Sequence, residues 1–95
     1  MFDWDPRKAN SNWVKHGVSF EEAATAFLDA AGLDGEDVEH SAGEERRLRL
    51  AKSSLSRILV IAYTIRRKDH EEVTRIISAR RASRKERNTY EAEKD

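Results

Sequence analysis

The most apolar stretch of the 95-residue chain is Arg57-Ile58-Leu59-Val60-Ile61-Ala62-Tyr63-Thr64-Ile65. Apolar side chains occupy both alternating sets of its positions: Ile58, Val60 and Ala62 in one, Leu59, Ile61 and Tyr63 in the other. Successive side chains of a β-strand point to opposite faces of a sheet, so this pattern is typical of a strand covered on both sides. We therefore predict that residues 57–65 form the central strand of a sheet.

Weaker strand signals flank this segment. Residues 44–50 alternate, with Leu48 and Leu50 on one face and Arg47 and Arg49 on the other. A last strand is predicted at 73–80. The remaining predicted elements are a polar turn at 52–56, a charged hairpin loop at 66–72, a short first strand at 2–4 and an edge strand within 33–38.

Three helices are predicted from capping signals. Asp5 and Pro6 are typical of a helix start, and Gly17 of a helix end. Ser19 with Glu22, and Ser83 with Glu86, have capping-box spacing, which predicts a second helix and a C-terminal helix that ends near Glu91. Apolar residues are expected to face inward at Ala9, Trp13, Phe20, Ala23, Ala24, Phe27 and Leu28. The expected fold is one α+β domain over residues 1–95, with helices on one face of an antiparallel sheet.

The composition excludes several classes of protein. Hydrophobic and charged residues each make up 38% of the chain, and cysteine is absent, which excludes a disulfide scaffold and a thiolate metal site. The apolar run 58–63 is far shorter than the ~20 residues that span a bilayer. The acidic segment Met1–Asp5 lacks the apolar core of a secretory signal. A soluble cytoplasmic protein is therefore expected.

The net charge of the chain is zero, but its two halves carry opposite net charges. Residues 1–45 contain three Lys/Arg and eleven Asp/Glu, a net charge of −8, whereas residues 46–95 contain fifteen and seven, a net charge of +8. Twelve of the eighteen basic residues are arginine, whose planar fork suits bidentate contact with phosphate. The basic half favours a polyanionic partner, although a charged surface that only maintains solubility gives the same pattern.

The three histidines lack the spacing of a metal site. His16, His40 and His70 do not form a His-x-x-x-His pair, and no cysteine completes a set, so we expect no metal ion. Because there is no glycine-rich phosphate loop either, we expect no nucleotide cofactor. His16 ends the predicted first helix, where a histidine usually stabilises the helix dipole. His40 lies in a loop just before an acidic and basic run; it suits general acid–base chemistry, and equally an exposed loop residue.

The arginines of the basic half form the remaining candidate site. Arg66 follows the central strand, and Arg84 and Arg87 begin the last helix. Arg80 ends the last strand just before that helix, where a guanidinium and free backbone N–H groups together form a natural anion site. Five positions separate Arg75 from Arg80, so the two point to opposite faces of a regular strand unless a bulge intervenes.

An ordered set of motifs resembles the BrnT family, the toxin half of a bacterial type II toxin–antitoxin pair. The matching residues are Phe2-Asp3-Trp4-Asp5-Pro6 with Lys8, Lys15-His16-Gly17-Val18-Ser19-Phe20-Glu21-Glu22-Ala23, His40-Ser41 with Gly43-Glu44-Glu45-Arg46, Tyr63-Thr64, and Arg75-Ile76-Ile77-Ser78-Ala79-Arg80 with Ala82, Glu86, Arg87 and Tyr90. The resemblance implies a compact fold like that of RelE-type ribonucleases and metal-independent RNA cleavage that inhibits translation and growth. It also implies a partner, the BrnA antitoxin, whose ribbon-helix-helix domain binds DNA so that the complex represses its own operon.

Metal-independent cleavage of RNA requires particular catalytic groups. In a metal-free ribonuclease the RNA 2′-OH attacks the neighbouring phosphate, which requires a base, an acid and cations. We expect catalytic roles for Arg80, Arg66, Thr64 and, as acid or base, His40. Phosphate contacts are expected from Arg46, Arg75, Arg84 and Arg87.

One position departs from the family pattern. Ile65 stands where family members often carry glutamate at the end of the central strand. If that glutamate is the base elsewhere, this chain is a weak or inactive toxin that acts mainly within a DNA-bound repressor complex. A third interpretation is that the basic half only binds an acidic segment of a partner protein.

Overall fold

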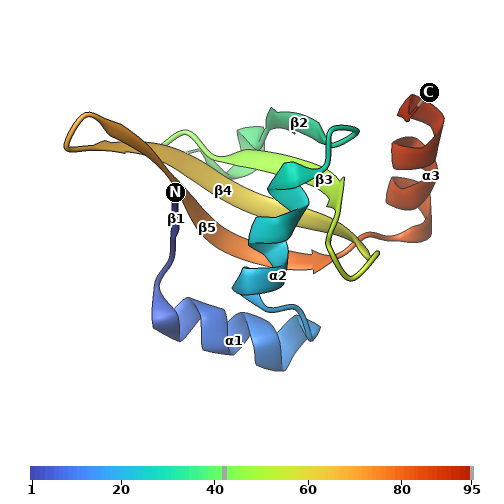
Figure 1. The fold of residues 1–95 in the computed structure, drawn as a ribbon, viewed down its shortest axis with the longest axis horizontal. Helices are drawn as coiled ribbons and strands as arrows, with labels where there is room; N and C mark the ends of the chain where they lie inside the picture. The colour runs from blue at the N-terminus through green and yellow to red at the C-terminus, as the bar shows by residue number, and fades with distance from the viewer. Residues whose placement is uncertain (42, 95) are drawn as a thin grey trace.

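The computed structural model describes residues 1–41 and 43–94; Ala42 and Asp95, the last residue of the predicted domain, lie outside the described residues. Within these residues the centre of the fold is a five-stranded sheet with the order β1-β5-β4-β3-β2 (Figure 1). The strands are β1 (Phe2–Asp3), β2 (Leu33–Glu36), β3 (Arg47–Lys52), β4 (Ile58–Lys68) and β5 (Glu71–Arg81). The middle strand is β4, which is buried from residue 59 to residue 64. The predicted central strand is thereby confirmed.

The sheet is mixed rather than purely antiparallel. β1 pairs with β5 in parallel, with Phe2 opposite Thr74, whereas the three other pairings are antiparallel. Parallel neighbours require a long crossover connection, and here most of the chain lies between the two strands. The α+β class is confirmed, and the expectation of an antiparallel sheet is wrong at this edge.

The hairpin between β4 and β5 is tighter than predicted. Instead of a loop over 66–72, both strands continue until Lys68 pairs with Glu71. Only Asp69 and His70 form the turn, with positive φ angles of 53° and 69°. Two-residue hairpin turns prefer such left-handed conformations because their twist matches that of the strands. Since glycine is the usual residue there, its absence hid the turn in the sequence.

Helices complete the fold at one face and one end of the sheet. They are α1 (Pro6–His16), α2 (Phe20–Thr25), α3 (Arg84–Glu93) and the short 3-10 helices η1 (Ala26–Leu28) and η2 (Val38–His40). In Figure 1, α2 crosses one face of the sheet, α1 runs beside it near β5, and α3 stands at the far end. The predicted caps at Asp5, Gly17 and Ser83 are confirmed. None of the helices in the described part of the chain is long and apolar enough to cross a membrane.

The hydrophobic core lies between α2 and the sheet, where Val18, Phe20, Ala23 and Ala26 pack with Ala51, Leu59, Ile61, Ile76 and Ala79. Leu28 was expected in this core but is 87% exposed. The chain tightens to a 3-10 helix at Ala26, which rotates later side chains away from the α-helical period. Trp13 was also expected inside and is 57% exposed. Asn12 takes the buried position of α1 instead.

Arg49 occupies the core side of the sheet. It pairs with Ile61, so its side chain lies on the face that α2 covers, and the residue is 8% exposed. Its Nε donates to the Ala26 carbonyl oxygen over 3.1 Å, and its Nη1 to Asp34 Oδ2 over 2.6 Å. The alternation predicted for this strand is confirmed, but this arginine stabilises the fold rather than facing a partner.

Candidate active site

A β-bulge in β5 brings Arg75 and Arg80 to one face of the sheet. Ala62 pairs with Ser78 but Tyr63 pairs with Ile76, so Ile77 is an extra residue between two regular segments. Paired residues on neighbouring strands share a face. Arg80 pairs with Val60 and Arg75 with Thr64, which lie four positions apart and therefore on the same face of β4. A bulge was one of the two possibilities for this strand, the other being that the two arginines point to opposite faces. The bulge explains how both arginines reach the face away from α2.

Two adjoining cavities lie on this face and share His40 and Arg46. The first has a volume of about 220 Å³ and is lined by Lys8, His40, Glu44, Arg46, Thr64, Arg66, Arg75 and Ile77. The second has a volume of about 350 Å³, and Asp37, Ser78 and Arg80 contribute to its lining. We call the two cavities together the arginine groove. Six of the eight residues predicted for the site line it, namely His40, Arg46, Thr64, Arg66, Arg75 and Arg80.

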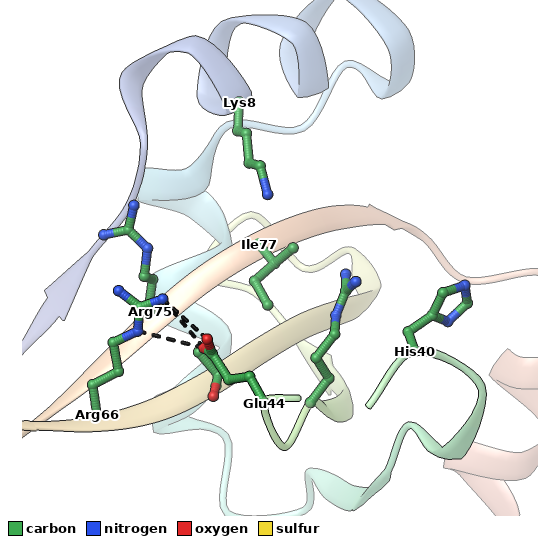
Figure 2. Close-up of a pocket in the computed structure, with 8 residues that line it drawn as sticks. Lys8, His40, Glu44, Arg66, Arg75 and Ile77 are labelled. Atoms are coloured by element: carbon green, nitrogen blue, oxygen red, sulfur yellow. Dashed lines mark hydrogen bonds and ion pairs between the residues drawn. The ribbon is translucent and has the colours of Figure 1, made fainter. Parts of the chain in front are cut away.

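The arginines of the first cavity are paired loosely with carboxylates. Figure 2 shows Glu44 beside Arg66 and Arg75, with Lys8 reaching in from α1 and His40 at the opposite end. Arg66 donates to the Glu44 carboxylate over 3.2–3.4 Å, and Arg75 Nη1 lies 3.3 Å from Asp3 Oδ2. Charge-assisted hydrogen bonds are typically ~2.7–2.9 Å long. Because these pairs are longer and partly exposed, a phosphate oxygen can replace the carboxylates.

The Arg66 guanidinium holds the pKa of Glu44 below its usual range. Glu44 is therefore a carboxylate at neutral pH and above. Glu44 lines the first cavity beside Arg66 and Arg75, and an ionised carboxylate in that place can accept a proton. Glu44 belongs to the motif that resembles the family, but no role was predicted for it, because the direction of a side chain in an irregular loop cannot be assigned from a repeating pattern.

Arg46 carries an unused hydrogen-bond donor at the junction of the two cavities. Its Nε is buried and has no hydrogen-bond partner among the described residues. Leaving a buried donor unpaired costs about 1–3 kcal/mol, and more for a charged group. Arg46 lines both cavities, and its guanidinium therefore has donor capacity that the described residues do not use.

The loop that carries His40, Glu44 and Arg46 is closed at its base. The Asp37 N–H donates to the Arg46 carbonyl oxygen over 2.8 Å, and the Ser41 hydroxyl donates to the Asp37 carbonyl oxygen over 2.6 Å. The Asp37 carboxylate contacts His40 Nδ1 at 3.1 Å. This contact orients the imidazole through Nδ1 and leaves Nε2 for a further hydrogen bond.

Thr64 connects this loop to the central strand. The residue is 2% exposed, and its hydroxyl donates to the Glu45 carbonyl oxygen over 2.8 Å. It was predicted to be catalytic and it lines the first cavity. Its observed contact, however, is one that holds the backbone between Glu44 and Arg46 against β4.

Arg80 is held more tightly than the other arginines. Its Nη1 and Nη2 donate to the two oxygens of Glu86 over 2.8 and 2.9 Å, and Glu86 also accepts from the Ser83 N–H in the capping box of α3. Arg80 lowers the pKa of Glu86 to about 2, further assisted by the Ser83 N–H. Arg80 thus joins β5 to α3, and a phosphate must compete with this carboxylate.

The Arg80–Glu86 pair predicts a pH-dependent contribution to stability. The pKa of Glu86 is about 2 in the folded protein against an ordinary 4.5, so its contribution is fully present above about pH 5 and is lost as pH falls toward 2. Both side chains are partly exposed, which limits the contribution to about 1 kcal/mol. The difference in free energy of unfolding between wild type and Glu86→Gln, measured by urea denaturation, should shrink over this pH range. A difference that stays constant would show that the pair does not stabilise α3.

Three predicted or discussed positions lie away from the arginine groove. Arg84 and Arg87 are on α3 and are not among its lining residues; Arg87 instead donates to the Ala82 carbonyl oxygen over 3.1 Å. Ile65 pairs with Thr74 and therefore lies on the opposite face from Thr64 and Arg66. A glutamate at position 65 would not point into this groove in a regular strand.

No metal centre is formed in the described part of the chain, where no three His, Cys, Asp or Glu side chains are placed to hold an ion. The sequence also missed Lys8 as a site residue. It lines the first cavity from α1, and the only signal was its place in the family motif, because nothing in the sequence shows which sheet edge the helix meets.

Comparison with known proteins identifies the family. The family model described as "Ribonuclease toxin, BrnT, of type II toxin-antitoxin system" matches residues 4–86. The chain belongs to the BrnT ribonuclease toxin family. The predicted resemblance is thereby confirmed, and membership in a toxin–antitoxin family implies an antitoxin partner.

A solved structure supports the fold. The chain resembles the crystal structure of the Brucella abortus ribonuclease toxin, BrnT, with a TM-score of 0.63 and 20% sequence identity over 88% of this chain and 99% of the Brucella chain. This likeness confirms the BrnT fold of the α+β structure; the closer likeness to RelE-type ribonucleases stays a prediction. A search of curated proteins finds no match.

Proposed function

We propose that this BrnT-family chain is a metal-independent endoribonuclease that binds RNA in the arginine groove. The observation that carries the proposal is the convergence of Arg46, Arg66 and Arg75 on one cavity, with the buried Nε of Arg46 unpartnered among the described residues. Three guanidinium groups around a phosphate supply the cations that stabilise its developing charge. Since Arg66 and Arg75 are only loosely paired, they are available to the substrate.

The groove also contains groups that can move protons. In the proposed reaction Glu44 takes the proton of an RNA 2′-OH, and the 2′ oxygen forms a bond to the adjacent phosphorus. The bond from phosphorus to the 5′ oxygen breaks, and His40 Nε2 delivers a proton to that oxygen. The products are a 2′,3′-cyclic phosphate and a 5′-OH, so the RNA supplies its own nucleophile and the chain supplies the base, the acid and the cations.

The remaining predicted residues support this arrangement. Thr64 positions the loop that carries Glu44 and Arg46. Arg80 lines the second cavity and contacts a phosphate there if it exchanges Glu86 for the substrate. Arg84 and Arg87 would contact only RNA that extends beyond the groove onto α3.

The biological consequences follow from RNA cleavage. Cutting RNA in the cytoplasm inhibits translation and growth. An antitoxin of the BrnA type, with a ribbon-helix-helix domain bound to DNA, would neutralise the chain and repress the operon. No cofactor is required, because every chemical role is filled by a side chain of the groove.

Purified protein should cleave single-stranded RNA in the presence of EDTA. Arg75→Gln removes a cation from the first cavity and is expected to lower the cleavage rate about 10²-fold, in the range found when one donor to a transition-state oxyanion is lost. Arg67→Gln is the matched control, because Arg67 is 75% exposed on the neighbouring strand and does not line the groove. Cleavage that requires a metal ion, or that both variants retain, would contradict the proposal.

A different outcome would favour a binding module without catalysis. Ile65 at the position where the family often carries glutamate motivates this alternative. Binding without product, with log K falling against log salt at a slope near −3 for about four phosphate contacts, would identify it. An acidic peptide that binds more tightly than RNA would instead support a site for a partner protein.

A further inference from the structure

A third cavity continues the arginine groove along α1. It has a volume of about 210 Å³, and it shares Lys8 and Ile77 with the first cavity and Ser78 with the second. Its other lining residues include Ser11, Lys15 and His16 from the same helix. We infer that this cavity is a subsite for a second phosphate of a single-stranded RNA, next to the phosphate that is cut. The inference rests on the proposed function of the groove.

The helix presents one polar face to this cavity. Positions 8, 11, 12 and 15 follow the three- and four-residue spacing that places side chains on one side of an α-helix. Lys15 lies seven residues after Lys8, about 10 Å further along the helix axis at 1.5 Å per residue. Lys15 therefore serves a phosphate different from the one that Lys8 and Arg75 reach.

Asn12 fixes the walls of the cavity. Its amide nitrogen donates to the carbonyl oxygens of Ala79 and Val18 over 2.8 and 3.0 Å, and its amide oxygen accepts from the Ala79 N–H over 3.0 Å. The Asn12 side chain is buried, and it forms with the Ala79 backbone the two hydrogen bonds that a neighbouring strand would otherwise form. Because these bonds hold α1 against β5, the spacing between the lysines and the bulge exists before any ligand binds.

The charges at this subsite are available to an anion. Lys8 and Lys15 form no ion pair with any described residue, unlike Arg66, Arg75 and Arg80. No acidic side chain is among the residues that line the cavity. Lys15 also stabilises the negative end of the α1 dipole, but that role does not explain Lys8, which lies in the first turn of the same helix.

The lining also indicates how the RNA is recognised. Lysine ammonium groups and a serine hydroxyl suit phosphate and ribose oxygens, and His16 at the end of α1 is the lining residue with an aromatic ring on which a base could stack. The subsite therefore recognises chiefly the phosphate and ribose of the RNA, because two lysines and Ser11 outnumber the one ring. It would extend the bound segment beyond the two nucleotides that flank the cut.

The test compares two noncleavable probes, a 2′-O-methyl RNA dinucleotide and an octamer, by fluorescence anisotropy at several salt concentrations. Lys15→Gln should weaken octamer binding about fivefold at 0.1 M salt and reduce the salt slope by about 0.7, the loss of one single-strand phosphate contact. Dinucleotide binding should be unchanged. Lys52→Gln is the control and should alter neither probe, because Lys52 lines a separate cavity beside η1.

Arg75→Gln separates failure of the subsite from failure of the proposed function. If Arg75→Gln weakens both probes while Lys15→Gln leaves the octamer slope unchanged, the subsite is wrong and the groove still binds RNA. If neither variant changes binding, or neither probe binds, the proposed function and the subsite are both overturned. If Lys15→Gln weakens only an oligoglutamate peptide, the cavity binds a protein partner and the inference is also overturned.

Discussion

Replacing Glu44 with glutamine should lower RNA cleavage by two to four orders of magnitude while noncleavable RNA still binds. A positioned general base contributes ~10²–10⁴-fold to a rate, and the amide cannot accept the proton of the 2′-OH. RNA affinity should not fall, because the variant removes a negative charge that pairs with Arg66. Single-turnover cleavage and anisotropy measure the two effects separately.

Glu45→Gln is the matched control for this variant. Glu45 is adjacent in the loop, its side chain is 67% exposed, and it pairs with Arg47 rather than with a residue of the groove. In the wild type, Arg66 lowers the pKa of Glu44 below the ordinary 4.5, so the acid limb of kcat/KM should lie below that pH and disappear in Glu44→Gln. If Glu44→Gln retains the wild-type rate and Arg75→Gln does not, Glu44 only pairs with Arg66 and the base is another group.

The fold was predictable where a residue type and a repeating pattern agree. The apolar run 57–65 has a composition that only a buried strand or helix satisfies, and its length and β-branched residues favour the strand. Asp5, Gly17 and Ser83 act through bonds to their own neighbours, so their caps are local properties of the sequence. Asp69 and His70 form an equally local turn, but neither residue is the glycine that signals it.

The site was predictable only in part, because register decides which side chains meet. The arginine-rich half and the family motif pointed to most residues of the groove. No sequence pattern places an extra residue at Ile77, and without that bulge Arg75 and Arg80 would lie on opposite faces. The carboxylate partners were also hidden, since Asp3, Glu44 and Glu86 reach the arginines from three separate segments.

The same long-range dependence separates Arg49 from the arginines of the groove. By its alternation in β3 it resembles Arg47, and both are basic residues in the basic half. The packing around each side chain shows that Arg49, unlike Arg47, is enclosed by the fold. The Cβ of any residue larger than glycine at position 32 would overlap the Arg49 guanidinium, which shows how closely the chain encloses it. Its carbon Cζ also lies 5.3 Å from the centre of the Phe27 ring.

Arg49→Met should therefore be the most destabilising of these changes, at about 3–5 kcal/mol, as when one partner of a buried ion pair is removed. The variant removes the Arg49 hydrogen bonds to the Ala26 and Asp29 carbonyl oxygens and to Asp34 Oδ2. The Asp34 carboxylate keeps the Tyr63 hydroxyl as a donor but loses its charged partner. For a domain of this size that loss lowers Tm by more than about 10 °C. Thermal denaturation followed by circular dichroism measures the change.

Arg47→Met is the control, because Arg47 lies on the same strand and face but makes only long bonds of 3.3 and 3.4 Å to Tyr63 and Glu45. It should cost less than about 1 kcal/mol. Equal losses in the two variants would mean that the enclosure of Arg49 does not stabilise the fold. A selective loss in Arg49→Met would assign this arginine to the structure, because a residue that only binds RNA can be replaced without lowering the stability of the free protein.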